Sequence, residues 1–197
     1  HRAGEQGREV SHTKQYLIET ETIAGLVDVA QIEAMAQELV ALRERGGKLF
    51  VIGLGGSAAN ASHAVNDFRK LCGINAIAPT DNVAELTARA NDEGWAAIFD
   101  GAFWTSQDAL LVLSVGGGTY LVSPGITAAV VNAKKHGMRI LGIVGRDGGY
   151  TKELGDCIIL IPTVKQERIT PHTEGWQSVL LHCIVSHPDL QRKPTKW

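Results

Sequence analysis

The chain has 197 residues, of which 44% are hydrophobic and 20% charged, a composition typical of one folded domain and not of a disordered or fibrous chain. Its net charge is −2 without a long run of Lys or Arg, and its apolar stretches are shorter than the roughly 18 residues of a membrane span, so we expect neither a nucleic-acid nor a membrane partner. The one excess is glycine, with 22 residues.

The first part of the chain is predicted to be helical. Residues 1–9 contain two glycines and read as a loose N-terminal arm without the features of a secretory signal. Apolar residues then recur at three- and four-residue steps, which predicts an N-terminal helical hairpin over 10–46 that breaks near Gly25 to Asp28 and stops at Gly46-Gly47.

After residue 47 strands and helices alternate. Short apolar runs predict strands beginning at Lys48, Ile74, Ala109, Arg139 and Cys157. Helical patterns separate most of them, over 58–72, 82–104, 124–136 and 173–187. Unbroken apolar strands that alternate with helices predict an α/β fold, a doubly wound parallel sheet covered on both faces. We assign 47–188 to this domain and 189–197 to a C-terminal tail, and we expect ligands at the carboxyl ends of the strands.

The number and spacing of the cysteines indicate the redox state of the compartment in which the protein works. Cys72, Cys157 and Cys183 are odd in number and widely spaced, and they form no C-x-x-C pair. This favours a reducing cytoplasm over a disulfide framework. Cys157 lies in an apolar run and is expected to be a buried small hydrophobe.

A glycine loop follows the first predicted strand. Gly55, Gly56 and Ser57 open the next helix, where free backbone N–H groups and the helix dipole suit a phosphate. The same segment, from Gly53 to Ala58, satisfies the dinucleotide pattern G-x-G-x-x-A. However, the acid that should end the second strand is missing, so we expect no nucleotide cofactor.

A second loop of the same kind follows the strand that begins at Ala109. It offers hydroxyls at Ser114 and Thr119 around Gly116, Gly117 and Gly118. Ser123, before Pro124, is a predicted N-cap of the next helix. The two loops together predict a two-sided anion cradle. A third loop, Gly145 to Gly149, is predicted to be a tight turn.

Acids and imidazoles lie on two of the predicted helices. His63 and Asp67 are four residues apart on one helix face, and the last helix carries Glu174 and His182. Together they suit a general acid/base pair or a His/carboxylate metal site. Eight residues of straight helix rise roughly 12 Å, so Glu174 and His182 can share one metal only if the helix starts late, as Gly175 would permit, bends, or donates to different chains.

The order and spacing of these motifs resemble the sugar isomerase (SIS) domain family, specifically its phosphoheptose isomerases. The resemblance runs from about Ala34 to His187. It rests on the segments Leu54-GGS, His63 with Asp67, Asn91-Asp92, the Ser114 loop, His136-GM, Gly145-RDGG and the acid ahead of Leu181-His182.

The resemblance implies a five-stranded parallel sheet and a homotetramer whose active sites are shared between subunits. It implies interconversion of sedoheptulose 7-phosphate and a heptose 7-phosphate through an enediolate. The family's catalytic glutamate and histidine fall on Asp67 and His182, and its phosphate-binding serines fall on Ser57 and Ser114. An aspartate of the family's site falls on Asp92. Some members bind zinc at the positions of His63, Asp67, Glu174 and His182.

This chain departs from the family at several of those positions. Leu54 replaces an asparagine, Asp67 replaces the longer glutamate, and Glu174 stands where glutamine is usual. The second loop has three glycines in place of serines and threonines. Two hypotheses follow. The first is a sugar-phosphate isomerase, with Asp67 as base and His182 as acid in the mechanism ranked first and metal-assisted enolisation as the second mechanism. The second is a non-catalytic SIS-domain protein that binds a sugar phosphate or a replication initiator.

Overall fold

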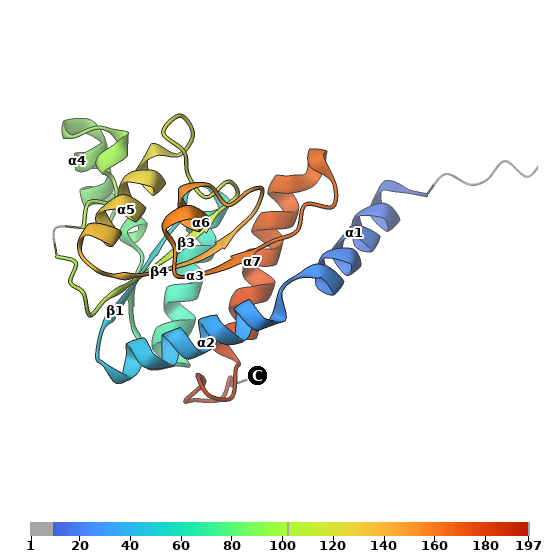
Figure 1. Cartoon of the computed structure of the whole chain (residues 1–197), viewed down its shortest axis with the longest axis horizontal. Coiled ribbons are helices and arrows are strands. Elements are labelled where there is room, and N and C mark those ends of the chain that lie inside the picture. The colour runs from blue at the N-terminus through green and yellow to red at the C-terminus, as the bar shows by residue number, and fades with distance from the viewer. Residues whose placement is uncertain (1–9, 102, 197) are drawn as a thin grey trace, which may run out of the picture.

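The computed structural model describes residues 10–101 and 103–196, so the predicted arm at 1–9 lies outside the described residues. Its centre is one parallel sheet with the strand order β2-β1-β3-β4-β5 (Figure 1). The strands are β1 (Lys48–Ile52), β2 (Asn75–Ile77), β3 (Ala109–Ser114), β4 (Arg139–Val144) and β5 (Cys157–Leu160). The five strands and their parallel pairing confirm the predicted α/β fold.

Helices connect the strands and cover both faces of the sheet (Figure 1). They are α1 (His12–Leu26), α2 (Val29–Glu44), α3 (Gly56–Lys70), α4 (Val83–Asp92), α5 (Pro124–Lys135), α6 (Gly149–Leu154) and α7 (Ile169–Val185). Within the described ranges, no helix has both the length and the apolar character needed to cross a bilayer.

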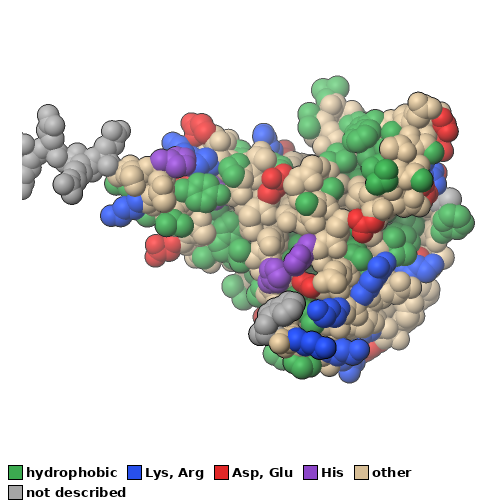
Figure 2. All heavy atoms as spheres, turned by 180° about the vertical axis from the view of Figure 1, so that it is seen from behind, with side chains coloured by type: hydrophobic (Ala, Val, Ile, Leu, Met, Phe, Trp, Pro, Cys, Tyr) green, Lys and Arg blue, Asp and Glu red, His purple; other side chains and the backbone are tan. Residues whose placement is uncertain are grey.

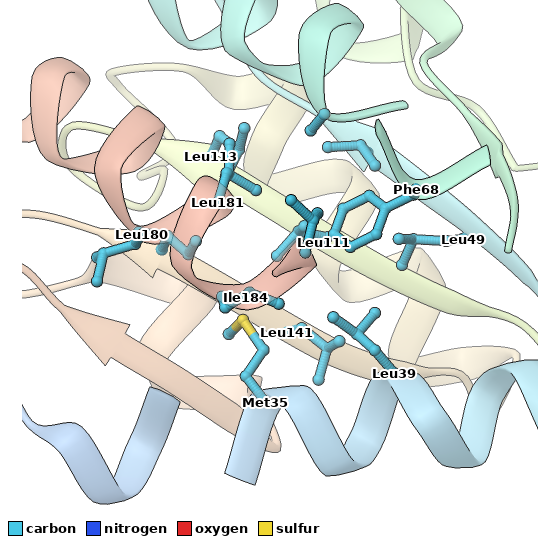
Figure 3. Packing of buried hydrophobic residues seen from close by; sticks show 14 of the residues in the cluster. Met35, Leu39, Leu49, Phe68, Leu111, Leu113, Leu141, Leu180, Leu181 and Ile184 are labelled. Atoms are coloured by element: carbon cyan, nitrogen blue, oxygen red, sulfur yellow. The ribbon is translucent and has the colours of Figure 1, made fainter. Parts of the chain in front are cut away.

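The two faces of the sheet bury separate clusters of apolar side chains. Along β3, Leu111 and Leu113 face α2, α3 and α7, whereas Leu110 and Val112 face α5. This alternation is the two-residue period of a strand that is buried on both sides. Figure 3 shows the first cluster, in which Phe68 of α3 lies among leucines of the sheet and of the neighbouring helices.

The strand order creates a crevice at one edge of the sheet. The chain leaves β1 for β2 on one side and then returns to add β3 on the other side. The loops after β1 and β3 therefore diverge at the carboxyl ends of two neighbouring strands, the point at which open α/β sheets bind ligands. Residues of both glycine loops lie at this point and line the cavity described below.

Two sequence expectations need correction, and a third is confirmed. The break between the two N-terminal helices is confirmed, but α1 projects beyond α2 instead of folding back along it as a hairpin (Figure 1). Helix α7 begins at Ile169, so the late start at Gly175 is wrong; Pro171 fits a first helical turn, and buried neighbours such as Trp176 hold the glycine in helix. The tight turn predicted at Gly145 to Gly149 is confirmed, because the Gly148 N–H donates to the Gly145 carbonyl over 3.0 Å; the turn leads directly into a short helix, α6, which starts after Gly148 in a left-handed conformation.

The segment after α7 packs against the body. Leu190 is fully buried, and the guanidinium of Arg43 on α2 donates to the Leu190 carbonyl over 2.6 Å. Backbone N–H groups of Arg192 and Lys193 donate to the Leu71 carbonyl at the end of α3. The described part of the predicted tail, 189–196, therefore holds the C-terminal ends of α2 and α3 together. Cys157 is buried as expected, and burial raises the pKa of its thiol to about 11.

A buried ionic cluster ties the projecting helix α1 to the start of α7. Glu19 is 4% exposed, and its carboxylate accepts from Arg168 Nε at 2.7 Å and lies 2.8 Å from His172 Nε2. The Tyr16 ring stacks on the His172 ring with centroids 4.4 Å apart. These hydrogen bonds, first of all the one from Arg168, lower the pKa of Glu19 far below its ordinary value.

We predict that this cluster makes the free energy of unfolding depend on pH. Because the Glu19 pKa is lower in the folded than in the unfolded chain, its contribution is complete above the unfolded pKa of about 4.3 and is lost as pH falls toward the folded value. Urea denaturation from pH 7 to pH 3 should show this loss, with a weaker pH dependence in Glu19→Gln, which should also be less stable at pH 7. The same dependence of the unfolding free energy on pH in the unmodified protein and in Glu19→Gln would contradict the prediction.

Candidate active site

A cavity of about 480 Å³ opens at the carboxyl ends of β1, β3 and β4. Both glycine loops contribute to it, as the sequence predicts. Of the residues expected to bind substrate, Ser57, Ser114, Gly116, Gly118, Thr119 and Ser123 line the cavity. These residues bring hydroxyls and glycine backbone to its walls, groups that can hydrogen-bond to the oxygens of a phosphate.

Other residues expected at this site lie outside the cavity lining. Gly56 is covered by the Glu174 carboxylate, because a Cβ built on Gly56 would lie 2.5 Å from Glu174 Oε2. Gly55 takes a left-handed φ of 58° as the residue before α3. Gly117 packs against the third glycine loop, and Asp92 is exposed at the end of α4.

The second and third glycine loops are interlocked. The Gly145 N–H donates to the carbonyls of Ser114 and Val115, and the Thr151 hydroxyl donates to the Gly117 carbonyl at 2.7 Å. Within the second loop, the Ser114 hydroxyl accepts from the Gly117 N–H at 3.0 Å. These bonds fix one wall of the cavity, while the Ser114 hydroxyl keeps its own proton to donate to a ligand.

Six further residues line the cavity that the sequence did not predict for the site. They are Leu54, Val115, Val122, Arg146, Asp147 and Thr170. The sequence signal that could have placed Arg146 in the cavity is its position directly after Gly145, the glycine that follows β4. Ser123 precedes α5 as predicted, but its side chain makes no capping hydrogen bond to the helix, and its backbone has a left-handed φ of 59°.

A second group of functional side chains lies where α3 and α7 pack side by side. The His63 Nε2 and Asp67 Oδ2 atoms are 3.1 Å apart, and His182 Nδ1 lies 3.9 Å from the same oxygen. The two imidazole rings meet edge to face with centroids 5.1 Å apart. Asp67 is 14% exposed, whereas both histidines are more than half exposed, so the carboxylate lies at the base of an open His/Asp/His cluster.

This cluster can hold a metal ion. One ligand atom from each of His63, Asp67 and His182 lies within 4.8 Å of the others, and they form the metal-ligand group found among the described residues. Two imidazoles and one carboxylate are donors that zinc accepts, and three protein ligands leave a position for substrate. The same three side chains can equally hold a base and an acid next to one another.

Glu174, the fourth predicted ligand, lies elsewhere. Its carboxylate faces Gly56 at the start of α3, and its carbonyl accepts from the Asn60 amide at 2.9 Å. Because α7 is helical on both sides of Gly175, Glu174 lies more than two turns before His182. The structure therefore places Glu174 beside the positive end of the α3 dipole, away from the His/Asp/His cluster of its own chain.

Cavity and cluster are separate within one chain. None of the three cluster residues lines the cavity in the described part of the chain. Ser57 and Asp67 are ten residues apart on the continuous helix α3, a rise of about 15 Å. One chain thus presents the cavity at one end of the α3/α7 pair and the His/Asp/His cluster toward the other.

We predict that the interlocked loops make Gly117 irreplaceable. A Cβ there would lie 1.8 Å from the Gly148 carbonyl oxygen on a backbone with φ of 70°, so Gly117→Ala should destabilise the protein by more than about 2 kcal/mol. The matched control is Gly116→Ala, whose Cβ would meet only Arg146 Cδ at 3.6 Å and should cost within about 0.5 kcal/mol. Urea denaturation measures both, and equal costs would contradict the interlock.

Comparison with known proteins identifies the family. The family model described as the SIS domain matches residues 20–145. The phosphoheptose isomerase of Chlorobium phaeobacteroides is 38% identical over 143 residues, which cover 68% of this chain and 62% of that relative, less than two thirds of its length. The phosphoheptose isomerase of Burkholderia pseudomallei is 31% identical over 192 residues, covering 91% of this chain and 93% of that protein.

The fold agrees with these matches. The solved structure of a phosphoheptose isomerase from Francisella tularensis superposes with a TM-score of 0.77 at 24% identity, covering 93% of this chain and 97% of that one. The resemblance inferred from the motifs is therefore confirmed. The chain belongs to the SIS domain family, with phosphoheptose isomerases as its sequence relatives.

Proposed function

We propose that the protein is a sugar-phosphate isomerase that interconverts sedoheptulose 7-phosphate and an aldoheptose 7-phosphate. The observation that carries this proposal is the convergence of His63, Asp67 and His182 at the α3/α7 contact. Its relatives are phosphoheptose isomerases, and its cavity offers hydroxyls and glycine backbone suited to a phosphate.

The reaction needs two proton relays. Asp67 removes the proton from C1 of the ketose and returns it to C2 after an enediol has formed. His182, within reach of the same ligand, gives a proton to the C2 oxygen and takes one from the C1 hydroxyl, which leaves the aldose. His63 holds the Asp67 carboxylate in place through its 3.1 Å contact.

We further propose that the His/Asp/His cluster accepts zinc. His63, Asp67 and His182 would hold the ion, which would supply polarisation of the sugar carbonyl. A carboxylate bound tightly to a metal is a poor base, so Asp67 cannot be both a tight ligand and an efficient base. We therefore rank two mechanisms: first the metal-free one, in which Asp67 is the base, and second the metal-assisted one, in which Asp67 is a ligand.

The separation of cavity and cluster leads us to propose a shared site. In a homotetramer the cavity of one subunit would face the cluster of another, which would place the phosphate in the cradle and C1 and C2 beside Asp67. Helix α1 supports such an assembly, because it projects from the body and exposes apolar side chains, with Leu17 and Leu26 each 61% exposed (Figure 2).

Turnover of sedoheptulose 7-phosphate tests the activity. We predict aldoheptose 7-phosphate formation by the purified protein, assayed with and without added zinc, and a fall in kcat of about 10²- to 10⁴-fold in Asp67→Asn because the base is lost. Glu153→Gln, an exposed carboxylate on α6, is the control and should keep full activity. Sugar-phosphate binding without turnover would contradict the isomerase and favour a binding protein.

Complementation tests the shared site. Asp67→Asn removes the base. Thr119→Asp places a negative charge in the cavity, and the new carboxylate can still accept the hydrogen bond from the Val122 N–H. Each variant alone should therefore be inactive. Randomly mixed subunits should recover activity in about a quarter of shared sites, each built from one intact cavity and one intact cluster. No recovery in oligomers shown to be mixed would place the whole site in one chain.

A further inference from the structure

Arg146 lines the cavity, and the proposed reaction gives it no role. It follows β4 directly and lines the cavity beside Ser114 and Gly116. The side chains and glycines that line the cavity include one cation, Arg146, and one anion, Asp147. The Asp147 carboxylate accepts from the Gly149 N–H at 3.2 Å, so it is used within its own turn.

The backbone of Arg146 is strained. Its φ is 52°, a left-handed value that is unfavourable for a non-glycine residue. In the described ranges, the other non-glycine residue with positive φ is Ser123, which lines the same cavity. Strain of this kind persists where the surrounding structure enforces it, and it is concentrated at ligand sites.

The guanidinium of Arg146 is available to a ligand. Other arginines are committed, since Arg139 and Arg168 pair with carboxylates and Arg69 donates to a backbone carbonyl. Among the described residues, no carboxylate or carbonyl pairs with the guanidinium of Arg146. An arginine fork presents its donors in the geometry that suits two oxygens of a phosphate.

The loops place the Arg146 side chain beside the cradle. The Gly145 N–H is bonded to the Ser114 and Val115 carbonyls, which fixes the start of the turn against the second loop. A Cβ built on Gly116 would lie 3.6 Å from Arg146 Cδ, an ordinary van der Waals distance, so the arginine stem runs alongside the second loop. The glycine-rich second loop, which offers few hydroxyls of its own, therefore lies directly beside a cation.

We propose that Arg146 binds the phosphate group of the substrate and supplies the positive charge of the cradle. This inference rests on the proposed function for the nature of the ligand. The Ser57 and Ser114 hydroxyls and the loop backbone then orient the phosphate, while Arg146 neutralises it.

The test compares variants that fit the left-handed backbone. Asparagine and glycine tolerate a positive φ, so Arg146→Asn and Arg146→Gly should fold. Each should raise KM for sedoheptulose 7-phosphate about 10- to 100-fold, the range for loss of a charge-assisted hydrogen bond, with kcat changed less than about 3-fold. Arg146→Lys should lie in between. Lys152→Gln, an exposed cation on α6 outside the cavity lining, should match the unmodified protein.

Direct binding separates this proposal from the isomerase assignment. Calorimetry with inorganic phosphate and with sedoheptulose 7-phosphate should show the same 10- to 100-fold loss in Arg146→Asn and Arg146→Gly, even if the unmodified protein shows no turnover. Binding of unphosphorylated sedoheptulose should be unchanged. Phosphate binding that is equal in the folded variants and the unmodified protein would overturn the role of Arg146, whatever the activity.

Discussion

The packing of α3 against α7 determines where the functional side chains of this chain lie. Both helices cover one face of the sheet, and Phe68 and Leu181 bury their side chains in the same cluster. Asn60 bridges the two helices by donating to the Glu174 carbonyl and the Gln177 amide oxygen, and the fully buried Gln177 donates in turn to the β4 carbonyl of Ile143. Because of this pairing, Gly56 and Glu174 meet at one end of the two helices, and Asp67 and His182 meet further along.

The second constraint is backbone geometry at the carboxyl edge of the sheet. Two glycine loops from different strands approach more closely than side chains would allow, and hydrogen bonds between them leave a wall with little freedom. An anion site made of backbone and hydroxyls needs such rigidity, because a preorganised cradle does not have to be ordered when the ligand binds. The strained residues Ser123 and Arg146 lie on that rigid frame.

Much of this architecture could be predicted from the sequence. The apolar periods located the five strands and most helices, and glycines after strands located the cavity, since both signals come from local backbone chemistry. Tertiary contacts decided the rest. The helical start at Ile169 depends on burial of its neighbours, and no local pattern indicates that Glu174 turns to Gly56 while His182 turns to Asp67. The cluster of Glu19 with Arg168 joins residues 149 positions apart, beyond any sequence period.

We propose that phosphate binding and proton transfer take place at opposite ends of the α3/α7 pair and are brought together across subunits. A crystal structure with sedoheptulose 7-phosphate bound would test this arrangement. We expect the phosphate within hydrogen-bond distance of Ser57, Ser114 and Arg146 in one subunit, with C1 and C2 between Asp67 and His182 of a neighbouring subunit. A sugar phosphate whose C1 and C2 approach no Asp67, or whose phosphate lies outside the glycine loops, would contradict it.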